Sequence, residues 1–247
     1  MTRKAFYVDL GKTPQKFENT VMVTGFMGFG LVGYITVDFL VNKLKPEKIG
    51  YIVTRLMPDQ VSYSEERGLE LPFEVYYLKR EEGKSLVILH NRWIPHPLDR
   101  FAYARFVIKW AKRRNVEALY AFGGLDNSYK EEPSEKLRWV KTSWYQGPLP
   151  EAKPMKGGLK VVGPLAHLLE AAEIWRLPAL ALLPFCESMR QDPRASAIGL
   201  EEFSKLVGLE LDTKELIEKA EQIEKELETL RQMMMSTATS GRESHYM

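Results

Sequence analysis

Cysteine and histidine are both scarce in this chain of 247 residues. Cys186 is the one cysteine, which excludes an internal disulfide framework and a cysteine-rich zinc site. There are four histidines, and the stretch between His90 and His96 offers no carboxylate or thiolate ligand and no metal-ligand spacing. The sequence therefore predicts neither a metal site nor a bound cofactor.

Long hydrophobic runs and a large net charge are also missing. No run approaches the roughly 18 apolar residues that span a membrane, and residues 1–9 lack the apolar core of a signal peptide. The net charge of +2 gives no strong field toward nucleic acid or membrane. The cations at the end of segment 98–114 either form a basic stripe that binds nucleic acid or stabilise the C-terminal end of the helix dipole. The low net charge favours the role at the helix dipole. We expect a cytoplasmic protein with no nucleic-acid or membrane partner.

What the sequence does contain is an alternation of strand-like and helical segments. Its 45% hydrophobic content is enough for one sizeable core. The alternation favours an α/β layered domain with a largely parallel sheet, and the turn at 79–84 predicts an antiparallel hairpin that makes the sheet mixed. The strand-like runs are 21–24, 48–55, 73–78, 85–90, 117–122 and 178–183, and the helical patterns are 31–44, 98–114, 164–175, 195–207 and 213–235.

Residues 126–160 break this alternation. They hold four prolines together with Trp139, Trp144 and Tyr145, and they are expected to form a long loop. The aromatic side chains either create a partner-binding surface or cover an edge of the core.

A glycine-rich turn follows the first apolar run. Gly28, Gly30 and Gly33 spell G-x-G-x-x-G, which is typical of dinucleotide binding. Two details argue against that function: the turn is longer than the fingerprint allows, and the next strand-like run ends without the acidic residue that holds the ribose. The favoured interpretation is structural, with Gly25, Gly28, Gly30 and Gly33 packing helix 31–44 closely on the sheet.

Two other candidate sites are weaker. Gly83-Lys84-Ser85 resembles the end of a phosphate loop, but Leu78 stands where the first glycine belongs, so a hairpin turn is favoured. Cys186 follows an apolar run, where an α/β fold places active sites, and a nucleophilic thiolate would need His167 beside it. A core histidine is the commoner role for His167, and no catalytic residue is assigned.

The C-terminal helix carries the clearest periodic pattern. Asp212 and Glu215 predict a capping box, and i,i+4 pairs join Glu215 to Lys219 and Glu221 to Lys225. The helix either packs on its own domain or pairs with a neighbouring subunit, and we favour the second. The apolar seam steps by four and three residues, as in a heptad repeat, through Leu216, Ala220, Ile223, Leu227, Leu230 and Met234.

A set of short motifs, in order over residues 20–232, resembles the archaeal proteasome assembly chaperone family. The first is Gly25-Phe26-x-Gly28-x-Gly30-Leu31-Val32-Gly33, and the later ones include Ile94-Pro95-x-Pro97, Phe122-Gly123-Gly124-Leu125, Pro178-Ala179-Leu180-Ala181 and Asp192-Pro193-Arg194-Ala195. This resemblance implies a three-layer α/β/α sandwich akin to nucleoside phosphorylases. It also implies a non-enzymatic chaperone rather than a catalyst.

The last three residues, His245, Tyr246 and Met247, resemble the pattern of ligands that dock on the outer ring of the 20S proteasome core particle. In that pattern a hydrophobic residue and a penultimate tyrosine precede a free carboxylate, and His245 departs from it. We therefore predict a core domain over 1–211, an oligomerising helix over 212–235 and a flexible tail over 236–247 that binds the core particle. Two alternatives stay open: a small-molecule- or nucleotide-binding enzyme, and a subunit of a hetero-oligomer with another family member.

Overall fold

The computed structural model describes residues 5–243, with side chains described as far as Thr229 apart from Glu228. Within the described residues, five α-helices follow the five predicted helical patterns, and two short 3-10 helices accompany them. The α-helices are α1 (Val32–Leu44), α2 (Arg100–Arg113), α3 (Pro164–Ile174), α4 (Pro193–Val207) and α5 (Lys214–Glu243), and the 3-10 helices are η1 (Phe29–Leu31) and η2 (Asn127–Tyr129).

The strands alternate with these helices. They are β1 (Ala5–Asp9), β2 (Thr20–Gly25), β3 (Glu47–Thr54), β4 (Ser62–Ser64), β5 (Gly68–Glu70), β6 (Phe73–Leu78), β7 (Ser85–Asn91), β8 (Leu119–Phe122), β9 (Leu125–Asp126), β10 (Leu137–Lys141) and β11 (Ala179–Cys186).

Nine of the strands form one mixed sheet in the order β1-β3-β6-β7-β2-β8-β11-β10, with β9 paired to β11. The centre, β7-β2-β8-β11, is parallel, whereas β1, β3 and β6 on one side and β10 on the other pair antiparallel. The predicted hairpin between 73–78 and 85–90 is confirmed as β6–β7. The sheet is therefore mixed with a parallel centre.

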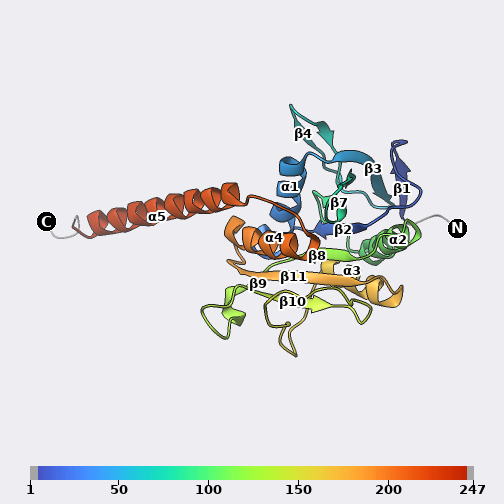
Figure 1. The fold of residues 1–247 in the computed structure, drawn as a ribbon. Coiled ribbons are helices and arrows are strands. Elements are labelled where there is room, and N and C mark those ends of the chain that lie inside the picture. The colour runs from blue at the N-terminus through green and yellow to red at the C-terminus, as the bar shows by residue number, and fades with distance from the viewer. Residues whose placement is uncertain (1–4, 244–247) are drawn as a thin grey trace.

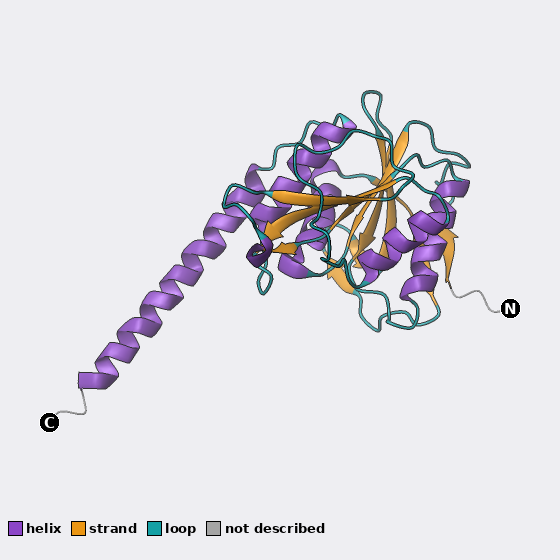
Figure 2. Ribbon diagram, turned by 90° about the horizontal axis from the view of Figure 1, so that it is seen from below, coloured by secondary structure: helices purple, strands orange, loops and turns teal. Residues whose placement is uncertain are grey.

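Helices cover both faces of this sheet, so the fold is the expected three-layer α/β/α sandwich (Figures 1 and 2). Alternate residues of one strand enter different cores: Met22 of β2 packs with α2 and α3, while its neighbours Val21 and Val23 pack with α1 and α4. This period of two is what a strand buried on both faces requires.

Helix α5 leaves the sandwich after its first turns and extends away from it as a single arm (Figures 1 and 2). Its 30 residues correspond to about 45 Å of helix. The helix ends at Glu243 rather than at the expected residue 235. Residues 236–243 contain no proline, and a helix that has already formed extends at little cost per residue.

Five short strands, β1, β4, β5, β9 and β10, were not predicted from the sequence. In particular, residues 126–160 are not one loop, because η2 and β10 lie within them and β9 ends at Asp126. Strand β10 pairs antiparallel with β11 from Leu137 opposite Pro184 to Lys141 opposite Leu180. Its five residues are too few for periodicity alone to identify. Within residues 5–243, no helix has the length and apolarity to cross a membrane.

Candidate functional site

The first turns of α5 are covered by the chain's own core. Leu216 and Ala220 are only 4% and 3% exposed, and Leu216 belongs to the same apolar cluster as Phe39 of α1. Farther along the helix, Ile223 is half-buried and Leu227 is 44% exposed. Leu216 and Ala220 thus pack on the chain's own domain, whereas Ile223 and Leu227 stay accessible in the single chain.

The start of α5 differs from the predicted capping box. The Asp212 carboxylate accepts a hydrogen bond from the Lys214 N–H at 3.0 Å. Glu215, however, does not bond back to Asp212, because its carboxylate pairs with Lys43 of α1. The prediction of a capping box is therefore wrong, and Glu215 forms an ion pair between α5 and α1 instead.

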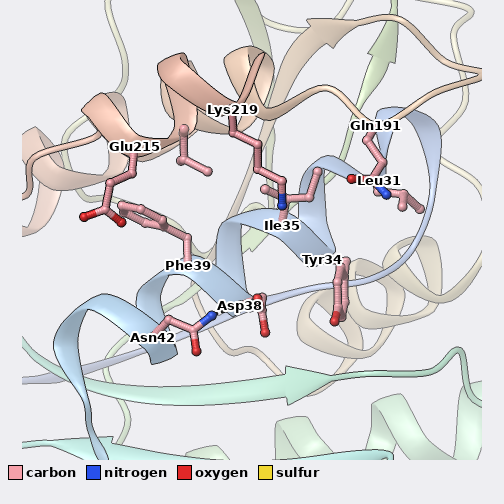
Figure 3. Close-up of a pocket in the computed structure, with 10 residues that line it drawn as sticks. Leu31, Tyr34, Ile35, Asp38, Phe39, Asn42, Gln191, Glu215 and Lys219 are labelled. Carbon is pink, nitrogen blue, oxygen red and sulfur yellow. Dashed lines mark hydrogen bonds between the residues drawn. The ribbon is translucent and has the colours of Figure 1, made fainter. Parts of the chain in front are cut away.

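A groove of about 380 Å³ lies between α1 and the first turns of α5. Figure 3 shows Lys219 reaching from α5 toward α1, with Tyr34, Asp38 and Asn42 on the α1 side. No ion pair within the described part of the chain joins Lys219 to Glu215, which was expected to be its partner. The α1 wall of the groove is polar because Tyr34, Asp38 and Asn42 line it. Asp38 also joins a cluster of charged side chains, since its carboxylate lies 3.7 Å from Arg92.

This charge cluster is buried between α1 and the strands β6 and β7. Arg92 donates to Glu70 at 2.7 Å, and Lys48 donates to Glu74 at 2.7 Å. His90 is fully buried, with Nε2 3.5 Å from Oδ1 of Asp38, and neither ring nitrogen has a hydrogen-bond partner among the described residues. Burial, and then the nearby cations led by Arg92, hold the pKa of His90 well below its usual value, so the ring is neutral.

The cluster also fastens the β4–β5 hairpin to the sandwich. A two-stranded hairpin is at best marginally stable by itself. Glu70 ends β5 and is paired with Arg92, which follows β7, and Arg67 at the turn donates to Asn42 of α1 at 2.6 Å. No role for these residues was predicted from the sequence. The run His90-Asn91-Arg92 at the carboxyl end of an apolar strand was the available signal.

The glycine turn brings α1 into close contact with the sheet. A Cβ on Gly25 would lie 2.2 Å from the Gly33 carbonyl oxygen, and a Cβ on Gly33 would lie 2.5 Å from that of Phe122. Gly30 adopts a φ of +61° beside the Cys186 sulfur. Gly28 differs from the other three, because its backbone is extended and a Cβ there would meet no atom within 4 Å.

Cys186 and His167 do not form a catalytic pair. Cys186 is completely buried beside Val32 and Ala195, and burial raises the pKa of its thiol to about 12. The His167 ring instead contacts Glu170, with Nδ1 2.9 Å from its carboxylate oxygen, and packs against Phe101. A protonated, inaccessible thiol is a poor nucleophile.

The aromatic residues of 126–160 mostly cover the edge of the core. Tyr145 is buried and its hydroxyl contacts that of Tyr120 at 3.0 Å. Trp139 donates through Nε1 to the Ala152 carbonyl oxygen at 2.8 Å. Trp144 is 40% exposed and Trp139 is half-buried, so these two tryptophans, unlike Tyr145, contribute to the outer surface.

A larger cavity, of about 630 Å³, opens beyond the carboxyl ends of β7, β2 and β8. This is where open α/β sheets bind ligands. Its walls come from the glycine turn, the segment 122–125, and the loop 155–163 that leads into α3. Among the described residues that line it, the polar side chains are Arg100, Tyr129 and Lys160, with no carboxylate, thiol, hydroxyl of serine or threonine, or imidazole.

The predicted docking residues His245, Tyr246 and Met247 lie outside the described residues, and so does the side chain of Leu230. The role of these residues stays a prediction.

Comparison with known proteins adds family information to this geometry. A model of the PAC2 family matches residues 22–231. Two uncharacterized proteins of Methanocaldococcus jannaschii are 24% and 26% identical to the chain, over 89% and 96% of it and 86% and 95% of their own lengths.

The fold also resembles two solved structures from Pyrococcus furiosus. PbaA, described as an archaeal homolog of proteasome-assembly chaperone, has a TM-score of 0.78 and 23% identity, over 99% of this chain and all of its own. PbaB, described as an archaeal proteasome activator, has a TM-score of 0.75 and 21% identity, over 93% of this chain and all of its own.

Proposed function

This chain belongs to the PAC2 family, and from that premise we propose that it is a non-enzymatic, proteasome-assembly-chaperone-like protein. It forms oligomers through α5 and docks on the proteasome core particle through His245, Tyr246 and Met247. The observation that carries the proposal is the family match over residues 22–231, which includes both the sandwich and most of α5. The proteasome enters the proposal through two similar structures: PbaA is described as a homolog of proteasome-assembly chaperone and PbaB as a proteasome activator.

The shape of α5 supports a docking role for the residues that follow it. The helix extends about 45 Å and its far end lies well away from the sandwich (Figure 2). A segment attached there is able to enter a pocket on a large partner without a clash between the two bodies. Tyrosine buries a large area at low entropic cost, and a terminal carboxylate forms a charge-assisted hydrogen bond with a lysine.

The seam of α5 supports the oligomer. Leu227 is exposed in the single chain, and Ile223 is only half-buried. A second copy of α5 packed along this seam would cover both side chains. Several tails on one oligomer would then bind a ring-shaped partner together, because each later contact is intramolecular.

A binding role rather than a catalytic one is supported by the side chains present at the usual ligand position of the fold. The described lining of the 630 Å³ cavity has two cations and one tyrosine, without an acid–base pair or an activated nucleophile. The nearby thiol of Cys186 is buried, with a raised pKa.

The proposal is tested by mixing the full-length protein with an archaeal proteasome core particle and recording native mass spectra. We expect a complex with the unmodified protein and none with Tyr246→Ala, since the alanine loses the buried ring. Tyr63→Ala is the matched control, because Tyr63 is an exposed tyrosine on the β4–β5 hairpin, 74% exposed. It should bind normally.

Each other outcome has a distinct meaning. Binding retained by Tyr246→Ala would move the contact to the surface of the sandwich. Absence of binding by all forms would refute the docking role, and the mass of the free protein would still report whether it assembles with itself.

A further inference from the structure

The cavity of about 630 Å³ has the size of a small-molecule site, since such sites occupy roughly 300 to 1,000 Å³. Most of its wall is apolar and comes from segments far apart in the sequence, including Phe26, Phe122, Leu165 and Leu183. Binding an apolar group there would release water from these side chains.

The charge of the lining selects among possible ligands. Arg100 opens α2 and donates through Nε to the Pro95 carbonyl oxygen at 3.1 Å, which fixes the guanidinium at the cavity wall. The two terminal guanidinium nitrogens of Arg100 make no hydrogen bond or ion pair with any side chain that the structure describes. Lys160, in the loop 155–163, adds a second cation, and no carboxylate in the described lining neutralises either one.

We propose that this cavity binds a small apolar carboxylate, such as a medium-chain fatty acid, with the carboxylate on Arg100 and the apolar chain along Phe26, Phe122 and Leu165. The free edge of a guanidinium presents two N–H groups that match the two oxygens of a carboxylate. The apolar wall accepts the rest of the molecule.

The same lining disfavours nucleotides and sugars. A dinucleotide site holds the ribose hydroxyls with a carboxylate, and the described lining has none, with Tyr129 as its one side-chain hydroxyl. Against a wall that is mostly apolar, several hydroxyls of a sugar would be buried without partners, which costs free energy. This ligand site is independent of docking on the proteasome, because it lies in the sandwich and not on α5 or the tail.

Dodecanoate, below the concentration at which it forms micelles, is the probe. Isothermal titration calorimetry of the full-length protein should give one site per chain. Arg100→Gln should weaken binding about tenfold or more, since a hydrogen bond to a charged group is lost.

Arg105→Gln is the matched control on the same helix, because Arg105 is exposed and does not line the cavity. The affinity of this variant for dodecanoate should equal that of the unmodified protein. Dodecanol, which has no charge, should bind both arginine variants and the unmodified protein alike.

Methionine methyl resonances in NMR spectra locate the ligand even if a variant folds poorly. Met27 and Met155 line the cavity, and their signals should shift when dodecanoate is added to the unmodified protein. Met189 is 96% exposed, and its signal should not move. Equal affinity of Arg100→Gln for dodecanoate, shifts confined to methionines outside the cavity, or no binding at all would each overturn the proposal.

Discussion

His90 illustrates how a single residue can be constrained by its surroundings. The ring lies near those of Tyr34 and Tyr76, with centroid distances of 5.8 and 6.5 Å, and is completely buried. Asp38 would favour the charged ring, but burial and the cation of Arg92 outweigh it, so the pKa of His90 falls well below its usual value. Charging this ring within the folded protein is therefore costly.

The consequence is a stability that depends on pH. The unfolded chain takes up a proton on His90 near pH 6.5, whereas the folded chain does not, so the free energy of unfolding should fall as the pH drops below about 6.5. The expected loss is roughly 1.4 kcal/mol for each pH unit, measured by urea unfolding between pH 7.5 and 5.

The control for this prediction is His90→Gln, which cannot titrate. Its absolute stability is not the test; its unfolding free energy should change less with pH than that of the unmodified protein. Carboxylates with lowered pKa values, such as Glu135, lose their contribution only below about pH 4.5. A variant with an unchanged pH dependence would contradict the assignment to His90.

At the scale of elements, α5 combines two roles along one apolar seam. Its first turns close the core over α1 and α4, and the rest extends beyond the sandwich (Figure 1). The heptad pattern is continuous across both parts. Sequence periodicity therefore identifies the apolar face, but the rest of the chain decides which part of that face is already covered.

Two alanine substitutions should separate these roles. Leu216→Ala removes a buried side chain and should lower the free energy of unfolding by about 2 to 5 kcal/mol. Leu227→Ala removes an exposed one and, at a concentration where the protein is a monomer, should change stability by no more than about 0.5 kcal/mol. Chemical denaturation of dilute protein measures both. Similar losses for the two variants would mean that Leu227 is buried within the single chain.

At the scale of the whole molecule, α5 projects from the α/β/α sandwich (Figure 1). If the oligomer makes the tails act together, disrupting the seam should weaken core-particle binding even though the tail is intact. Leu227→Glu should lower the oligomer mass in light scattering and reduce affinity for the core particle at least tenfold. Glu226→Gln, an exposed neighbour that is off the seam, should leave both unchanged. Undiminished affinity in a monomeric Leu227→Glu protein would show that one tail suffices.

The sequence by itself determined the type and order of the main elements, the α/β class, the β6–β7 hairpin and the apolar face of α5. These features follow from spacings of two to four residues, which local geometry fixes before any distant contact forms. The tertiary structure decided the strand order, the charge cluster around His90, the pairing of Glu215 with Lys43 and the cavity beside Arg100. Each of these joins residues far apart along the chain. Periodicity carries no record of such contacts, because the path of the chain through the sheet determines them.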